Sequence, residues 1–330
     1  MQPSVFPVSA RNAPSHSPLL ALPALALCFA LVGSSTNLFG QTDDFNDGND
    51  TGWVRYDPLA AFGLRATFSF PNGGYRIQTT YLTGMAENPG RAGTVLTNVY
   101  SDFYASVDVV DWDETVPQSF GLLARVGTVG LQTTTGYAFT WDRGNPTNAT
   151  AGDVDISTIT GEAPDGVSVT GSDSIHFEKG KKYRMVFIGR GAELEGRIYE
   201  LPNVETPVIA IIGTDSTYPS GQNGMVVFDN SGGQNKTDAT FDNFYATDIE
   251  PPRIGMQNDF FGSYTLSWPA EASRFVLQSS TVLTGTETDW TDVPATEIFP
   301  PGVTGRYSYS MAADPKVGGL PRQFFRLIRR

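Results

Sequence analysis

Short alternating runs of hydrophobic and polar residues, separated by turns, make up the chain from residue 43 onward. In Phe103–Val110, apolar side chains recur at every second position, which is the period of a strand with one buried face. No stretch has apolar residues at helical spacing over three turns. Similar short runs, bounded by turn residues, cover 120–126, 137–141, 183–189, 195–201, 208–213, 225–229 and 240–246. The pattern therefore predicts an all-β protein.

The composition supports this prediction and limits the possible partners. The chain has 35 glycines and 22 prolines, too many for a helical bundle, and its 12% aromatic content is too high for a disordered chain. Its formal net charge is −13. Because nucleic-acid binding requires basic surfaces, this charge excludes nucleic acid as the expected partner.

The first 40 residues have the layout of a secretory signal peptide. Leu19–Val32 is an apolar run of 14 residues that follows a segment without acidic side chains. The run is shorter than the ~20 residues that a spanning helix needs, and Pro23 interrupts it, although a retained membrane anchor is the alternative. Cys28 lies in this run, so the mature chain would contain no thiol. We expect a secreted or cell-surface protein with no membrane span after cleavage.

A change in charge and two adjacent prolines predict a domain boundary at residue 250. Residues 41–250 contain 13 basic and 28 acidic side chains, whereas residues 251–330 contain 8 and 7. Pro251 and Pro252 favour an extended linker between the two parts. The second part has five short strand-like runs, which predict a small immunoglobulin-like or fibronectin-like β-sandwich.

Five segments of the first part share one pattern: DDFNDGNDTGW (43–53), YASVDVVDW (104–112), SFGLLARVG (119–127), TGYAFTW (135–141) and ATFDNFYATD (239–248). With these segments, residues 43–248 resemble secreted laminin-G-like domains of the concanavalin A-like lectin/glucanase superfamily. This resemblance implies a jelly-roll sandwich of two antiparallel sheets whose first and last strands pair with each other. The superfamily includes lectins, glycosidases and adhesive modules, so the fold does not determine the function. The C-terminal part resembles small β-modules that end many exported bacterial proteins.

An acidic turn near residue 44 is a candidate calcium site. Asp44 and Asp47 lie in a glycine-containing turn, and the resemblance would bring Asp242 of the last strand near them. Ca²⁺ takes six to eight oxygen ligands, and flexible acidic loops supply such ligands. Calcium would then be structural and would tie the terminal strands together. The alternative is that these carboxylates are solvated and accept hydrogen bonds from the turn backbone.

Five residues are candidates for ligand binding. Trp112, Tyr137 and Trp141 would stack on sugar rings, since an aromatic plane covers the C–H face of a pyranose. Alternation places Tyr137 and Trp141 on the same face of one strand, so the alternative to sugar binding is that both rings pack in the core. Asp108 and Arg125 both lie in the middle of strands, where they would form either a sugar-binding pair or a surface salt bridge.

These residues favour a non-catalytic protein that binds carbohydrate or another extracellular surface. The acidic first domain repels anionic polysaccharides, so a neutral glycan bound by a shallow aromatic patch is the expected ligand. A glycoside hydrolase or lyase on the same fold is one alternative, and two carboxylates converging in a groove would indicate it. The glutamate-rich strand motif of the superfamily's glucanases is absent. A purely structural envelope module is the other alternative.

Overall fold

The computed structural model describes residues 40–80, 89–144, 152–168, 173–230, 236–258, 263–269, 275–282, 289–302, 305–311 and 324–329. The predicted signal peptide lies almost wholly outside these residues, as does Cys28. In the described part of the chain, no helix is long and apolar enough to cross a bilayer.

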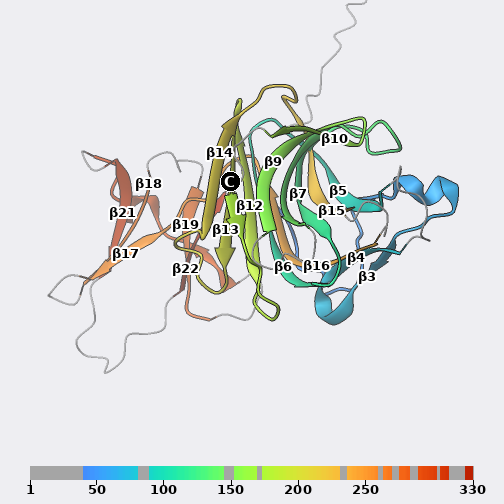
Figure 1. The fold of residues 1–330 in the computed structure, drawn as a ribbon. Helices are drawn as coiled ribbons and strands as arrows, with labels where there is room; N and C mark the ends of the chain where they lie inside the picture. Colours follow the sequence, from blue (N-terminus) through green and yellow to red (C-terminus); the bar gives the residue numbers. More distant parts are fainter. Residues whose placement is uncertain are drawn as a thin grey trace, which may run out of the picture. The chain divides into compact units, whose positions relative to one another are not determined.

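Sheet one is a large sheet of eight strands (Figure 1). Its members are β1 (Gln41–Asp43), β3 (Thr67–Ser69), β4 (Tyr75–Thr80), β6 (Phe103–Trp112), β12 (Tyr183–Arg190), β13 (Glu193–Glu200), β14 (Ile209–Thr214) and β16 (Lys236–Thr247). Their order is β14-β13-β12-β6-β16-β4-β3, with β1 also paired to β16, and every pairing is antiparallel.

Sheet two also has eight strands and is antiparallel throughout. Its members are β2 (Trp53–Tyr56), β5 (Arg91–Tyr100), β7 (Gln118–Val126), β8 (Gly136–Arg143), β9 (Gly152–Thr160), β10 (Ala163–Ser168), β11 (Asp173–Ile175) and β15 (Gly221–Asp229). Their order is β10-β9-β8-β7-β15-β5-β2, with β11 paired to β9. Two short 3-10 turns, η1 (Pro58–Phe62) and η2 (Pro71–Gly73), occur between β2 and β4.

The main core lies between sheets one and two. Alternate residues of β6, such as Phe103 and Val107, and alternate residues of β7, such as Phe120, belong to this core. The rings of Phe120 in sheet two and Phe241 in sheet one pack edge to face with centroids 6.4 Å apart. This arrangement confirms the predicted all-β sandwich of two antiparallel sheets.

The pairing of the first and last jelly-roll strands follows the prediction. β1 runs antiparallel to β16, and the register places Gln41 opposite Ala246 and Asp43 opposite Phe244. Asp43 accepts hydrogen bonds from the backbone N–H of Phe45 at 2.8 Å and from the indole N–H of Trp53 at 2.8 Å. Asp43, the first acidic residue of the turn, therefore stabilises the fold.

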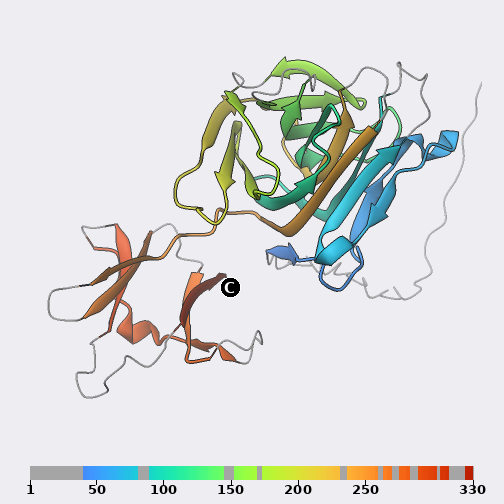
Figure 2. The ribbon, with the colours of Figure 1, turned by 60° about the horizontal axis from the view of Figure 1, so that its bottom comes forward.

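Residues 255–329 form two further three-stranded sheets, shown in orange and red in Figure 2. One has the order β17 (Gly255–Asn258), β18 (Tyr264–Pro269), β21 (Arg306–Met311), and the other β20 (Thr291–Asp292), β19 (Phe275–Ser280), β22 (Phe324–Arg329). A 3-10 turn, η5 (Ala295–Glu297), follows β20. Leu266, Trp268, Leu277 and Val293 form their own buried cluster. The immunoglobulin-like or fibronectin-like class and the boundary at residue 250 stay predictions.

Candidate functional site

The three aromatic candidates lie in the core, so the predicted stacking platform is wrong. Trp112, Tyr137 and Trp141 are 2%, 0% and 2% exposed. Trp141 stacks on Phe177 with centroids 4.6 Å apart, and the hydroxyl of Tyr137 donates to Asp215 at 2.5 Å. The physical reason is the alternation of β8, which turns Tyr137 and Trp141 toward sheet one and leaves the intervening residues on the outer face. Trp112, at the end of β6 in sheet one, packs edge to face on Trp141 with centroids 6.4 Å apart.

Asp108 and Arg125 do not form the pair that the sequence suggested. β6, which carries Asp108, belongs to sheet one, whereas β7, which carries Arg125, belongs to sheet two. Asp108 instead accepts two hydrogen bonds from Arg184, at 2.6 and 2.9 Å, and one from the amide of Asn243 at 3.0 Å. Asp108 is 3% exposed and fully engaged within the fold.

Arg125 is a buried structural residue. It is 2% exposed, and burial lowers the pKa of its guanidinium. Its guanidinium holds three loops by donating to backbone carbonyls: Ser101 at 2.7 Å, Gly191 at 2.7 Å and Tyr218 at 3.2 Å. A role in ligand binding is therefore not supported for Arg125.

The described side chains do not converge on a calcium site. Asp44 and Asp47 are exposed, and each accepts a hydrogen bond from a backbone N–H two residues later, at 3.2 Å. Burial raises the pKa of the half-buried Asp242, and the nearby charges of Asp108 and Asp44 raise it further. Among the residues that the structure describes, no group of three or more His, Cys, Asp or Glu side chains is placed to hold a metal ion. Calcium binding stays a prediction.

A cavity on the outer face of sheet two is the candidate functional site. Its volume is about 180 Å³, and strands β2, β5, β7, β8, β9 and β15 contribute to its lining. The floor is apolar because the outward residues of these strands form a second hydrophobic cluster, separate from the main core. The apolar residues that line it are Leu123, Ala138, Ile159, Val226 and Phe228.

One polar part of the lining, the Arg91 cluster, consists of Tyr56, Arg91 and Glu162. Arg91 and Glu162 form an ion pair at 3.0 Å, and their side chains are 8% and 3% exposed. The hydroxyl of Tyr56 donates to Glu162 at 2.5 Å, as does the backbone N–H of Gln132. Burial raises the pKa of Tyr56, and Glu162 raises it further. The charges and hydrogen bonds of this cluster are satisfied internally.

The ion pair of the Arg91 cluster spans the outer face of sheet two. Arg91 begins β5, and Glu162 lies in the turn between β9 and β10. In the sheet order, β15, β7 and β8 lie between β5 and β9. The turn that carries Glu162 therefore reaches across these strands, and the pair closes one side of the cavity.

The other polar part, the acidic cluster, consists of Asp142, Asp153 and Asp155. The register of β8 and β9 places Asp142 opposite Asp153 and Thr140 opposite Asp155, so all three carboxylates lie on the outer face. Asp142 and Asp155 line the cavity. In the described ranges, no lysine or arginine forms an ion pair with any of the three.

The environment of Asp142 disfavours its charge. Burial, and after it the charges of Asp155 and Asp153, raise the pKa of Asp142 to about 6, although Asn230 and Ser119 act in the opposite direction. Its Oδ1 atom is buried and has no hydrogen-bond partner among the described residues. Burial also raises the pKa of Asp155. Two carboxyl groups that have no cationic partner among the described residues therefore line the cavity.

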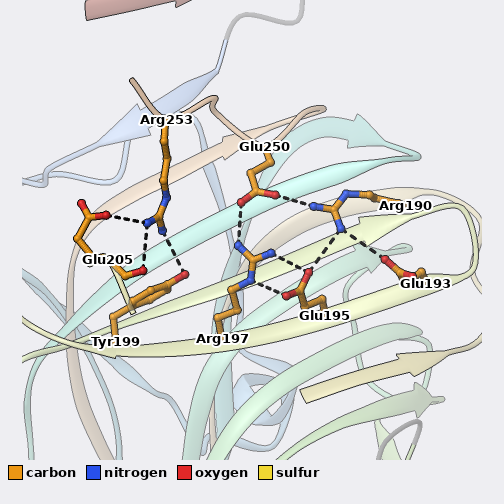
Figure 3. A network of polar contacts seen from close by, with 8 residues as sticks. All are labelled: Arg190, Glu193, Glu195, Arg197, Tyr199, Glu205, Glu250 and Arg253. Carbon is orange, nitrogen blue, oxygen red and sulfur yellow. Dashed lines mark hydrogen bonds and ion pairs between the residues drawn. The ribbon is translucent and has the colours of Figure 1, made fainter. Parts of the chain in front are cut away.

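On the outer face of sheet one, in contrast, charged side chains pair with one another (Figure 3). Arg197 donates to Glu195 at 2.5 Å and to Glu250 at 2.7 Å, and Arg190 donates to Glu250 at 2.5 Å. Hydrogen bonds to Glu195 and Glu250 raise the pKa of Arg197 although burial alone would lower it. Every carboxylate of this network has a cationic partner, so it offers no free acidic group.

The sequence analysis missed Asp142 and Asp155. The alternation in residues 137–143 that places three aromatic rings inside also places Thr140 and Asp142 outside, so the signal for Asp142 was present. The position of Asp155 depends on the register between β8 and β9, which the alternation does not specify.

The chain has similarities among solved structures but not among family models or curated proteins. No protein-family model matches the chain, and no curated protein matches it in sequence. Among solved structures, the chain is similar to the carbohydrate-binding module CBM66 from Bacillus subtilis, with 20% identity over 60% of this chain and 97% of that chain and a TM-score of 0.41. It is also similar to lectin II from Ulex europaeus, with 12% identity over 63% and 97% and a TM-score of 0.40. A GH43 protein from Bacillus licheniformis has 13% identity over 62% of this chain but 39% of its own, with a TM-score of 0.42.

Proposed function

We propose that the chain is an exported, non-catalytic protein whose jelly-roll domain, residues 41–250, binds carbohydrate in the cavity of sheet two. The observation that carries this proposal is the lining of that cavity, an apolar floor bordered by carboxyl, hydroxyl and amide groups. Sugars present both C–H faces and hydroxyl groups, so a mixed lining of this kind matches their surface. The cavity thus replaces the aromatic patch that the sequence predicted.

The size of the cavity sets the size of the ligand. A volume of about 180 Å³ equals roughly six water molecules at about 30 Å³ each, which is room for a single sugar ring. Drug-sized ligands occupy larger pockets, of about 300–1,000 Å³. We therefore expect recognition of one sugar unit or of a chain end.

The charge of the site argues against anionic sugars. The acidic cluster has no cationic partner among the described residues, and Arg91 is already engaged by Glu162. A sugar carboxylate or sulfate placed in this cavity would lie beside Asp142 and Asp155. Since like charges repel strongly where water is excluded, uronic acids and sulfated glycans should not bind.

A binding assay with two matched variants tests the proposal. A glycan array and calorimetric titrations with the purified protein should show saturable binding of one sugar class. Ala138→Phe, which fills the cavity, should remove that binding, whereas Ala210→Phe at an exposed position of β14 should leave it unchanged. Circular dichroism shows that each variant is folded. Equal loss in both variants, or no binding of any sugar by the wild type, would reject carbohydrate binding in this cavity.

The carboxyl pair favours glycoside hydrolysis as a second candidate function. A carboxyl group with a raised pKa beside a second carboxylate is the arrangement that general acid catalysis of glycosidic cleavage requires. Asp142 would be the acid and Asp155 the second carboxylate. Release of reducing ends from a polysaccharide, abolished in Asp142→Asn, would establish this activity. Unchanged polysaccharide after prolonged incubation would leave the binding function.

A further inference from the structure

Among the described residues, no strand next to the acidic cluster supplies a lysine or arginine that pairs with it. Ser119 of β7 lies opposite Asp142, Asn230 directly follows β15 and interacts with Asp142, and both residues are uncharged. Arg91 of β5 is engaged by Glu162 and by the carbonyl of Pro89 at 2.9 Å. Arg143 follows Asp142 in the chain, so strand alternation turns it to the opposite face.

The described residues of β11 supply no cation to the cluster either. On β11, the residue opposite Asp153 is Ser174, which is uncharged. Within the part of the chain that the structure describes, the carboxylates of Asp142, Asp153 and Asp155 therefore have no cationic partner.

A positively charged ligand group would relieve this imbalance. We propose that the cavity binds an amino sugar whose ammonium group lies at Asp142 and Asp155 and whose ring lies on the apolar floor. This inference rests on the proposed carbohydrate binding. An ammonium group donates three hydrogen bonds, and the carboxyl groups of Asp142 and Asp155 in the cavity lining are acceptors for them.

Amino sugar binding has a distinctive dependence on pH. The carboxyl of Asp142 must be ionised to receive the ammonium, and burial raises its pKa to about 6. The other charged groups around it are Asp153 and Asp155 on β9 and the paired Arg91 and Glu162. Affinity for an ammonium should therefore increase from pH 5 to pH 7 as Asp142 loses its proton.

Calorimetric titrations of the purified protein with three monosaccharides test the inference. At pH 7, glucosamine should bind at least about tenfold more tightly than glucose and N-acetylglucosamine, because only glucosamine carries an ammonium. Asp142→Asn should reduce glucosamine affinity to the level of glucose and remove the increase between pH 5 and pH 7. Asp173→Asn, which removes an exposed carboxylate outside the cavity lining, is the matched control and should behave as the wild type.

The outcomes separate this inference from the proposed function. Equal affinity for glucose and glucosamine would overturn the amino sugar preference and leave carbohydrate binding in place. Failure of all three sugars here and of every sugar on the glycan array would reject both. Calcium binding that disappears in Asp142→Asn would overturn the inference by assigning the carboxylates to a metal.

Discussion

The Arg91 cluster and the acidic cluster line the same cavity but differ in how their charges are compensated. The carboxylate of Glu162 has an ion pair with Arg91 and hydrogen bonds from Tyr56 and the backbone of Gln132. Asp142 has a buried oxygen without a described partner and two acidic neighbours. Burying an unpaired charge is unfavourable, so a fold that keeps one usually does so at a functional site. From this difference we infer that the Arg91 cluster stabilises the fold and that the acidic cluster contacts the ligand.

The largest effect is expected from breaking the Arg91 cluster. Arg91→Met leaves the carboxylate of Glu162 buried without its cation, which should lower the free energy of unfolding by about 3–5 kcal/mol. Urea unfolding at pH 7 measures this loss. Arg190→Met, in a pair that is 46% exposed on the arginine side, should cost at most about 1 kcal/mol. Equal losses for the two variants would show that the Arg91 cluster is not a buried structural pair.

An opposite and somewhat smaller effect is expected at Asp142. Its pKa is about 6 in the folded state against an ordinary value of 3.8, so the folded state holds the proton more tightly than the unfolded state. The free energy of unfolding should therefore fall as pH rises from about 4 to about 6, by roughly 2–3 kcal/mol. Asp142→Asn removes this penalty.

Calorimetric melting of ligand-free protein at pH 4 and pH 8 checks this effect. Asp142→Asn should melt at a higher temperature than the wild type at pH 8 and at nearly the same temperature at pH 4. A destabilised variant at pH 8, or a difference that does not depend on pH, would show that the carboxyl is compensated.

The smallest effect is expected from the hydrogen bond at Asp155. Burial raises the pKa of Asp155, and the hydroxyl of Thr140, which donates to this carboxyl at 3.1 Å, partly offsets that rise. Thr140→Val should reduce the free energy of unfolding by about 1 kcal/mol and raise the pKa of Asp155 further. Urea unfolding at pH 7 measures the first change. A variant that is more stable than the wild type would contradict the acceptor role of Asp155.

Strand alternation predicted much of the fold. The period of two in residues 103–110 follows from one strand face packing on the core, and the structure buries Phe103, Ala105, Val107 and Val109. The same reasoning could have placed Asp142 on the outer face. Alternation does not show which face of a strand contacts a ligand. The sequence therefore suggested binding by Trp112, Tyr137 and Trp141, whose rings pack between the sheets.

The remaining features of the site depend on strand order and register. Asp108 and Arg125 looked like partners because their strands follow each other in sequence, yet the chain crosses from sheet one to sheet two between them. Likewise, the contact of Arg91 with Glu162 spans three intervening strands and 71 positions in sequence. Such long-range pairing is set by tertiary packing and leaves no local pattern.

Carboxyl carbon NMR of Asp142, assigned by comparison with Asp142→Asn, tests the central claim most directly. Without ligand, the resonance should titrate with a midpoint near pH 6, because the carboxyl is buried beside two acidic residues. Saturation with glucosamine should shift the midpoint well below 6, since a bound ammonium stabilises the carboxylate. A midpoint near 4 in the free protein, or one that glucosamine leaves unchanged, would contradict an uncompensated carboxyl that receives the ligand.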